Sequence, residues 1–192
     1  MMSSATPPAP PSSPQDVFNR QLALSLALRS STAKDRIAKI KRLRDCVLKH
    51  KEEWYEAAWK DFRKPPAEVD IAEMLPVCIE ANTAIRHLKS WLRPKGVWPN
   101  LLTVGTSSRV QHVPRGRCLI VGPFNYPVNL TLSPLVSAIA AGNTVIVKPS
   151  ELTPNLSAVI AKVIAEVFPP EVGEVALFEG DAALASTLLE VS

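Results

Sequence analysis

The sequence predicts an α/β protein in which a helical part precedes a parallel sheet. Three observations carry this prediction. Apolar residues recur at helical spacing before about residue 92, short β-branched runs alternate with apolar helical stretches after residue 117, and glycine and proline punctuate the boundaries. Strands that alternate with helices pair in parallel through right-handed crossovers. The second half therefore predicts the first βαβαβ units of a Rossmann-like sheet, which we expect to be truncated at the end of the chain.

The helical part is expected to contain three helices. The first covers about Gln15 to Arg29. The second begins at Thr32–Asp35, whose spacing resembles a capping box, and ends near Lys64, because two prolines follow. The third covers about Ala67 to Trp91 and is expected to kink at Pro76.

The sheet part begins after a stretch with weaker signals. Residues 94–108 are typical of a loop, and residues 109–113 are a candidate strand. The expected strands of the sheet are 118–121, 144–148 and 175–178, and its helices are 128–141, 154–168 and a last one opened by Asp181. Pro134 either breaks or begins the first of these helices, and Gly142 stops it. Thr153 and Pro154 suit the N-cap and first position of the next.

Composition divides the chain into three parts. Residues 1–15 form a Pro/Ser-rich extension whose first fourteen residues hold five prolines and no charge, so we expect disorder. Residues 16–117 comprise the N-terminal helices and linking strands. Residues 118–192 form a partial dinucleotide-binding domain.

The charge of the chain is unevenly distributed. Residues 1–117 hold 20 Lys and Arg against 11 Asp and Glu, whereas residues 118–192 hold 2 against 7. A basic half can indicate nucleic-acid binding, which salt-independent or undetectable DNA affinity would exclude. Here the basic residues are mixed with acids along helices, which favours solvated helix faces and no nucleic-acid partner.

Membrane and metal sites are not expected. No apolar run approaches the roughly 20 residues that span a bilayer. Cys46, Cys78 and Cys118 are odd in number, widely spaced and set among apolar residues. They are typical of reduced, buried thiols in a cytoplasmic protein, without the spacing of metal ligands.

Asn125 follows the first predicted strand of the sheet, in a turn flanked by prolines. Parallel-sheet enzymes bind ligands at the carboxyl ends of strands. An amide fixed there can donate a hydrogen bond to an oxyanion, and one such donor contributes about 3 kcal/mol to a transition state. A turn asparagine that bonds its own backbone is an equally good interpretation of these residues alone.

Lys148 ends the second predicted strand, and Glu151 follows three residues later. An amine and a carboxylate on one rigid turn can each bond a ribose hydroxyl. The alternative is a surface ion pair that stabilises the fold by less than about 1 kcal/mol. The glycine-rich G-x-G-x-x-G phosphate loop is absent from the sequence.

These segments resemble the aldehyde dehydrogenase superfamily. FNYP at 124–127 is similar to the family signature PWNYP, and PLVSAIAAGNTVIVKPSELTP at 134–154 is similar to its AAGN…VKPSE signature. The sequence around these motifs is most similar to the class 3-like branch, which includes coniferyl-aldehyde-type enzymes. The resemblance covers about residue 16 to the end and marks the chain as the N-terminal portion of such an enzyme.

The resemblance implies a role for each matching residue. Asn125 corresponds to the amide that stabilises the thiohemiacetal oxyanion. Phe124 replaces the usual tryptophan and keeps an aromatic wall. The cofactor is NAD, possibly NADP, and Glu151 favours a free 2′-hydroxyl by charge repulsion. The residues implied to bind the cofactor are Phe124, Lys148, Pro149, Ser150 and Glu151.

The resemblance also implies a function that this chain does not complete. The family oxidises aldehydes to carboxylic acids through a cysteine thiohemiacetal, and the full-length form is expected to be a homodimer. No cysteine here matches the nucleophile, and the general-base glutamate is also missing, so the chain is expected to be inactive alone. The alternative is a truncated gene product that acts as a binding or oligomerisation module through the edge of its unfinished sheet.

Overall fold

The computed structural model describes residues 13–191 apart from residue 100. Residues 1–12 of the predicted disordered extension (1–15) lie outside the described residues. Pro14 and Gln15 belong to the first helix, so the extension ends earlier than predicted. The first half contains α1 (Pro14–Leu28), α2 (Ala33–Lys49), α3 (Lys51–Phe62), α4 (Pro66–Val69), a π-helical segment (Asp70–Met74), α5 (Leu75–Trp91), β1 (Lys95–Val97), a 3-10 turn (Leu101–Thr103) and β2 (Ser108–Val110). The second half contains β3 (Arg117–Val121), α6 (Pro127–Ala141), β4 (Thr144–Lys148), α7 (Pro154–Val167), β5 (Val175–Leu177) and α8 (Ala182–Val191).

The predicted α/β class and parallel sheet are confirmed. Strands β3, β4 and β5 pair in parallel in that order, and β3 and β4 run in register from Arg117–Thr144 to Val121–Lys148. The middle strand β4 is buried along its whole length, which suits its β-branched residues. Because the register ends at Val121 and Lys148, the turns after β3 and β4 leave the sheet side by side.

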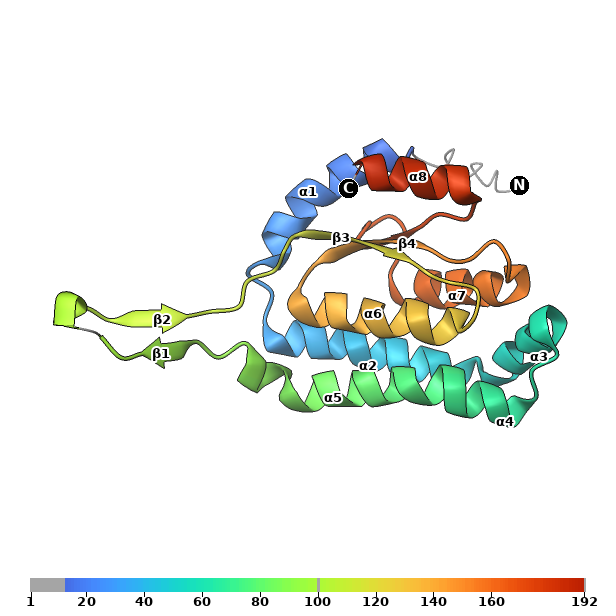
Figure 1. The fold of residues 1–192 in the computed structure, drawn as a ribbon, viewed down its shortest axis with the longest axis horizontal. Helices are drawn as coiled ribbons and strands as arrows, with labels where there is room; N and C mark the ends of the chain where they lie inside the picture. Colours follow the sequence, from blue (N-terminus) through green and yellow to red (C-terminus); the bar gives the residue numbers. More distant parts are fainter. Residues whose placement is uncertain (1–12, 100, 192) are drawn as a thin grey trace, which may run out of the picture.

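Helices cover both faces of the sheet (Figure 1). α1 and α8, from opposite ends of the chain, pack together on one face, and α6 and α7 pack on the other. α2 lies against α6 and α7, and α5 lies against α2 and α6. Apart from α1, the long helices of the first half therefore form a further layer outside α6 and α7.

One hydrophobic core joins the two halves of the chain. Ile40 and Trp54 from the first half belong to the same buried cluster as Val145 and Val147 from β4. A smaller cluster under α1 and α8, on the other face of the sheet, is formed by Val17, Ile146 and Leu188. The predicted domain boundary between residues 117 and 118 stays a prediction. The hydrophobic core contains residues from both sides of it.

The second helix does not run to Lys64 as predicted. It ends at Lys49, and α3 begins at Lys51. Trp54 donates from Nε1 to the carbonyl of Val47 at 2.9 Å across the junction. Apolar residues recur at helical spacing both before and after the junction. The sequence pattern therefore continues although the chain changes direction, and contacts with other elements hold the junction.

The third predicted helix contains a π-helical segment in place of a simple kink at Pro76. Proline has no N–H, so Pro76 cannot donate to the carbonyl of Ala72 four residues earlier. Asn129 of α6 donates from Nδ2 to that carbonyl at 3.3 Å. The segment Asp70–Met74 widens the helix by one residue at this point and turns Glu73 toward α6.

A two-stranded hairpin extends from the body of the molecule (Figure 1). β1 pairs antiparallel with β2, so part of the predicted loop at 94–108 is a strand, and the predicted strand at 109–113 is shorter and begins earlier. All six hairpin strand residues are exposed. Without a buried face, the strands have no alternation of polar and apolar residues by which the sequence could mark them.

Two details of the sheet part also differ from the predictions. α6 runs through Pro134 without a break and ends at Gly142, whose φ of 86° is left-handed as expected of a C-terminal stop. Cys118 is only half-buried, because its side of β3 lines a small cavity with Phe18 and Arg117. The edge position of β3 leaves that cavity open.

Candidate functional site

The predicted site residues lie in two adjacent turns at the carboxyl edge of the sheet. The Gly122 N–H donates to the carbonyl of Lys148 at 2.8 Å and joins the two turns. A Cβ at Gly122 would lie 2.2 Å from Thr131 Oγ1 and 3.5 Å from the Cα of Pro149. Glycine is therefore required where the first turn passes between α6 and the second turn.

Lys148 and Glu151 are brought together at the end of β4. The Lys148 side chain is 2% exposed, and its Nζ donates to Glu151 Oε2 at 2.7 Å and to the carbonyl of Pro149 at 3.2 Å. The Lys148 hydrogen bond lowers the pKa of the half-exposed Glu151 carboxyl. The pair presents a carboxylate to solvent with a buried ammonium behind it. The ammonium can donate a hydrogen bond to one hydroxyl of a diol, and the carboxylate can accept one from the other.

Pro149 and Ser150 shape the turn from inside the protein. Both residues are buried. Ser150 Oγ accepts the N–H of Leu152 at 3.2 Å, and its carbonyl accepts the Ser157 hydroxyl at 2.8 Å. These contacts hold the turn that follows Lys148 against the start of α7.

Asn125 and Phe124 lie exposed in the turn between β3 and α6. The Asn125 carbonyl accepts a hydrogen bond from Lys64 Nζ at 3.0 Å. Its side-chain amide has no hydrogen-bond partner among the residues that the structure describes. The alternative of a turn asparagine that bonds its own backbone is thus not the arrangement found, and the amide faces outward.

Sequence reasoning missed Lys64 and Glu73, which hold this turn. Glu73 Oε2 accepts the N–H groups of Val128 and Asn129, the first turn of α6, at 3.1 and 3.0 Å. Lys64 Nζ donates to Glu73 Oε1 at 3.0 Å. The signal by which Glu73 could have been found is a charged residue at an apolar helical position, three residues before Pro76.

The three thiols are poor nucleophiles at neutral pH. Burial, followed by the negative charge of Glu166, raises the pKa of Cys46 to about 11. Burial also raises the pKa of Cys78 and of Cys118. Since the thiolate is the reactive form, none of the three has the environment of a catalytic cysteine.

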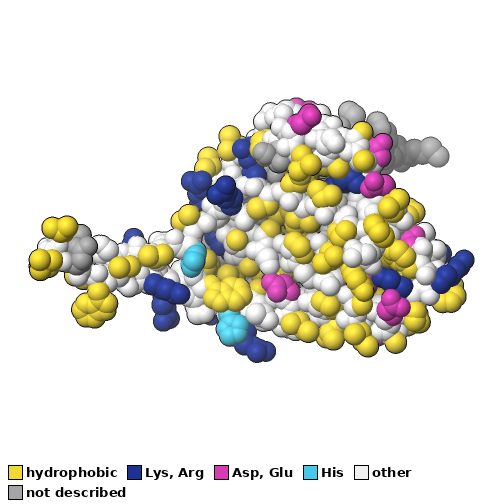
Figure 2. Space-filling model, in the orientation of Figure 1, with side chains coloured by type: hydrophobic (Ala, Val, Ile, Leu, Met, Phe, Trp, Pro, Cys, Tyr) yellow, Lys and Arg dark blue, Asp and Glu magenta, His cyan; other side chains and the backbone are white. Residues whose placement is uncertain are grey.

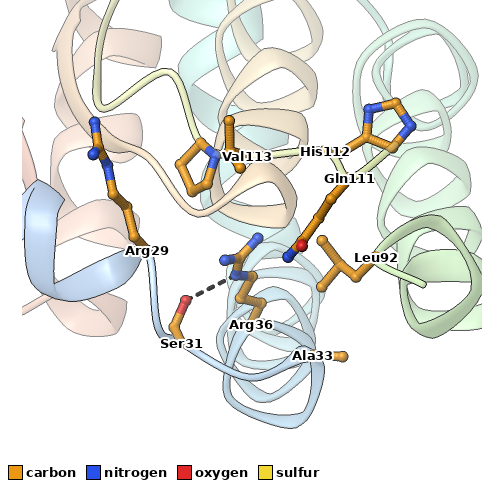
Figure 3. A pocket seen from close by; sticks show the side chains of 9 residues that line it. Arg29, Ser31, Ala33, Arg36, Leu92, Gln111, His112 and Val113 are labelled. Carbon is orange, nitrogen blue, oxygen red and sulfur yellow. Dashed lines mark hydrogen bonds between the residues drawn. The ribbon is translucent and has the colours of Figure 1, made fainter. Parts of the chain in front are cut away.

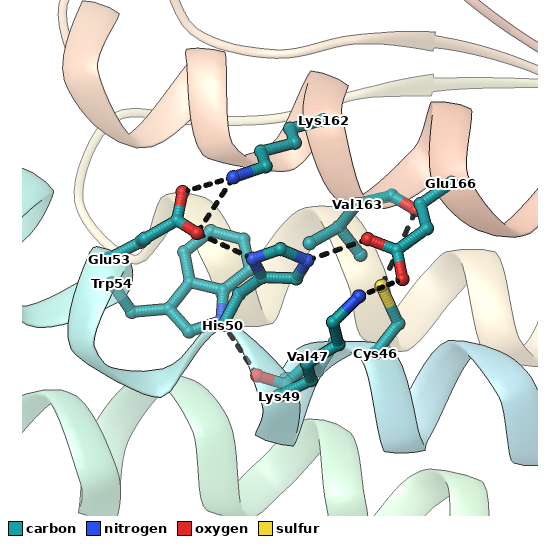
Figure 4. Close-up of polar contacts among 9 residues, drawn as sticks. All are labelled: Cys46, Val47, Lys49, His50, Glu53, Trp54, Lys162, Val163 and Glu166. Carbon is teal, nitrogen blue, oxygen red and sulfur yellow. Dashed lines mark hydrogen bonds and ion pairs between the residues drawn. The ribbon is translucent and has the colours of Figure 1, made fainter.

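A polar cluster joins the α2–α3 junction to α7 (Figure 4). Buried His50 lies between two carboxylates, with Nδ1 2.7 Å from Glu53 and Nε2 2.8 Å from Glu166. Lys162 pairs with Glu53 at 2.8 Å, and Lys49 pairs with Glu166 at 2.6 Å.

The potential ligand atoms of Cys46, His50 and Glu166 lie within 4.8 Å of one another. A thiol, an imidazole and a carboxylate are ligand types that zinc accepts. Each carboxylate of the cluster already has a lysine partner and a contact with His50. We interpret the cluster as an ion-pair ladder that holds α3 against α7.

A cavity of about 410 Å³ lies near the amino ends of β3 and β4, away from the predicted site (Figure 3). Arg36 points into it, yet its guanidinium donates to Ser31 Oγ at 2.8 Å and to the carbonyls of Ala140 and Leu28 at 3.1 and 3.4 Å. These bonds satisfy the C-terminal end of α6 and the α1–α2 link. The arginine in this cavity is therefore a structural group.

Comparisons with known proteins identify the family of the chain. Residues 19–190 match the model of the aldehyde dehydrogenase family. The chain belongs to this family. A Bacillus subtilis (strain 168) protein named as an aldehyde dehydrogenase, AldX, is 42% identical over 176 residues, which are 92% of this chain and 39% of AldX.

Further members of the aldehyde dehydrogenase family support the class 3-like resemblance. Mouse (Mus musculus) aldehyde dehydrogenase family 3 member B1 is 39% identical over 141 residues, which are 73% of this chain and 29% of the mouse protein. The solved structure of Staphylococcus aureus AldH in a substrate-bound state superimposes with a TM-score of 0.86 at 32% identity, over 91% of this chain and 38% of that one. The chain thus spans well under half the length of these relatives.

Proposed function

We propose that the chain is the N-terminal portion of an NAD(P)-dependent aldehyde dehydrogenase and forms one half of its active site. The observation that carries the proposal is the juxtaposition of two turns at one sheet edge. One presents the exposed Asn125 amide, which no other described residue binds, and the other presents the Lys148–Glu151 pair. Ligands of open parallel sheets bind at this edge.

Each turn has a role in this proposal. The Asn125 amide donates to the oxygen of the aldehyde as negative charge develops on it, a contribution of about 3 kcal/mol. Lys148 and Glu151 bind the adenosine ribose of the cofactor, with the buried turn at Pro149 and Ser150 holding them and Phe124 as a wall nearby. NAD or NADP, the cofactors of the family, supplies the hydride acceptor.

The reaction proposed for the complete enzyme oxidises an aldehyde to a carboxylic acid through a cysteine thiohemiacetal. The nucleophilic cysteine and the general-base glutamate belong to the remainder of the enzyme. Burial keeps the thiols of Cys46, Cys78 and Cys118 protonated. We therefore propose that these 192 residues turn over no aldehyde by themselves. By resemblance to the family, we also propose that the complete enzyme is a cytoplasmic homodimer.

Cofactor binding by the chain tests the proposal most directly. We expect NAD to shift the backbone NMR signals of Lys148 and Glu151. Lys148→Met should weaken the titration by about tenfold or more, because it removes a buried charge-assisted donor. Lys162→Met is the matched control, since Lys162 is exposed and pairs only with Glu53 in the structure described. Equal effects of the two variants would contradict the assignment.

The choice between NAD and NADP follows from the charge of Glu151. A carboxylate beside the ribose repels a 2′-phosphate, so we expect NAD to bind more tightly than NADP. Glu151→Gln should narrow the difference, because it removes the repulsion while retaining the side-chain length. The comparison requires only the two titrations on each variant.

Turnover is measured with NAD and a medium-chain aldehyde. The expected result is no activity above that of buffer. Activity that disappears when the three cysteines are replaced by serine would overturn the proposal that the nucleophile lies elsewhere.

An oligomerisation module is the second candidate, favoured by the projecting hairpin. Trp98 is 94% exposed, and Leu101 and Leu102 are each 93% exposed. Hydrophobic side chains gather at the tip of the projecting hairpin (Figure 2). An apolar surface of this kind is typical of association sites. Size-exclusion chromatography tests it: a monomer that is unchanged by Trp98→Ser with Leu101→Ser and Leu102→Ser would argue against this function.

A further inference from the structure

We infer that Lys64 and Glu73 are positioning residues for the Asn125 amide, an inference that rests on the proposed function. Together they hold both sides of the turn that carries Asn125. Neither residue belongs to the turn in sequence, since Lys64 follows α3 and Glu73 lies in the π-helical segment. The tertiary structure alone brings them there.

Glu73 holds the far side of the turn. Its carboxylate is fully buried, and one oxygen, Oε2, accepts the N–H groups of Val128 and Asn129. These groups belong to the first turn of α6, where backbone N–H groups have no partner within the helix. Tyr126, the N-cap residue, provides no side-chain cap. Glu73 therefore acts as the cap of α6 from another helix.

Lys64 holds the near side of the turn. Its side chain is 11% exposed, and Nζ donates to Glu73 Oε1 and to the Asn125 carbonyl, each at 3.0 Å. The same Nζ lies 4.7 Å from the ring centroids of Phe62 and Tyr126. The ammonium is thus fixed from several directions, and it fixes the peptide of Asn125 in turn.

The consequence is a rigid backbone beneath an exposed side chain that has no hydrogen-bond partner within the described part of the chain. The ion pair connects the Asn125 carbonyl to the N–H groups three and four residues later. A shift of residues 125–129 would therefore break charged hydrogen bonds, which range from the exposed contact of Lys64 with Asn125 to the buried contact of Glu73 with Val128. A donor that is held before the reaction needs no reorganisation when charge develops on the substrate. The ion pair restricts the backbone while leaving the amide free to donate.

The π-helical segment explains why the carboxylate reaches this position. Because Pro76 has no N–H, the Ala72 carbonyl is available to accept the hydrogen bond from Asn129 of α6. The irregular part of the helix therefore contacts α6 twice, through Glu73 and through this carbonyl. The device therefore consists of the ion pair together with the helix irregularity that presents it.

The experiment measures backbone and side-chain amide dynamics of the 192-residue chain by NMR. The variants are Glu73→Gln, Lys64→Met and the double variant, which removes both buried charges and so avoids leaving one unpaired. The controls are Glu80→Gln, whose carboxylate reaches α6 through Ser137, and Lys51→Met, which pairs with Asp70.

We expect hydrogen exchange at Val128 and Asn129 to accelerate by about tenfold or more in Glu73→Gln. In Lys64→Met and in the double variant, the Asn125 order parameter should fall from about 0.85 toward 0.6, while the controls match the parent chain. A general loss of stability would affect amides throughout the sheet and would not single out Asn125.

Unchanged order at Asn125 in a folded double variant would overturn the inference, even if exchange at Val128 and Asn129 accelerates, because Glu73 would then be a helix cap alone. The NAD titration of the parent chain reports on the proposed function separately. If the parent chain binds no NAD, the proposed function is contradicted. If the variants nevertheless lose order at Asn125, the positioning role is still supported.

Discussion

At the scale of single residues, the buried charges of this chain all have partners chosen by the fold. Lys148 lies against Glu151, and Glu73 lies against Lys64 and two backbone N–H groups. A charge removed from water is tolerated only when it is paired and hydrogen-bonded. The exposed Asn125 amide differs from them, because its backbone carbonyl is bound by Lys64 while its side chain has no hydrogen-bond partner among the described residues.

The carboxyl of Glu166 gives a prediction for the pH dependence of stability. Hydrogen bonds from Lys49 and then His50 lower its pKa from 4.5 to about 2. Because the folded pKa is below the unfolded one, the stabilisation is complete above about 4.5 and is lost as the pH falls toward 2. Glu166→Gln should therefore lower stability at neutral pH and flatten the decline in this window, as measured by urea denaturation at several pH values.

Glu171→Gln provides the control for that prediction. Glu171 is exposed and forms no ion pair within the part of the chain that the structure describes. A variant with the same pH profile as the parent chain is expected. The ion-pair ladder would be refuted if Glu166→Gln and Glu171→Gln shifted the profile equally.

At the scale of elements, backbone chemistry and tertiary contacts together decide where the helices end. α6 ends at Gly142, where a left-handed φ and the guanidinium of Arg36 leave no room for a side chain: a Cβ would lie 2.4 Å from Arg36 Cζ. Gly173 also has a positive φ, of 72°, but open space around it. These two glycines separate backbone strain from steric crowding.

Gly142→Ala should reduce the free energy of unfolding by about 2 to 4 kcal/mol, since it combines left-handed strain with displacement of Arg36 from the Ala140 carbonyl. Gly173→Ala should cost only the strain, about 1 to 2 kcal/mol. Urea denaturation of both variants measures the difference. Equal losses would show that Arg36 moves aside freely.

At the scale of the whole molecule, the two ends of the described chain meet on one face of the sheet. α1 is held there by Gln21, whose Nε2 donates to the carbonyls of Val145 and Gly173, each at 3.0 Å. α8 packs beside α1. The sheet is therefore covered on this face only when segments more than 150 residues apart come together. No helix among the described residues is long and apolar enough to cross a bilayer.

Leu188 and Leu189 test this layer with neighbouring residues. Leu188 is 1% exposed in the cluster with Val17 and Ile146, and Leu189 is 64% exposed. Leu188→Ala should lower stability by about 2 to 4 kcal/mol, whereas Leu189→Ala should change it by less than about 0.5 kcal/mol. Thermal or urea denaturation distinguishes them, and similar losses would contradict the packing of α8 on the sheet.

Local patterns were sufficient for much of the fold and for part of the site. The strands at 117–121 and 144–148 and the stop at Gly142 follow from β-branched runs and glycine, which act within a few residues. The Lys148–Glu151 pair was also predictable, because both side chains belong to one turn.

The junction at His50, the π-helical segment and the exposed hairpin were not predictable. The first two arise from bonds to distant elements, and the hairpin has no buried face to pattern its residues.

The sequence by itself determined the class of fold, the family and the pairing of Lys148 with Glu151, because the residues that specify them are close together along the chain. Only the tertiary structure decided how Asn125 is held. Lys64 and Glu73 lie 61 and 52 residues before it, and their charges become partners only after α3, the π-helical segment and α6 have packed together. A buried ion pair is a property of the space between elements, and no local pattern specifies that space.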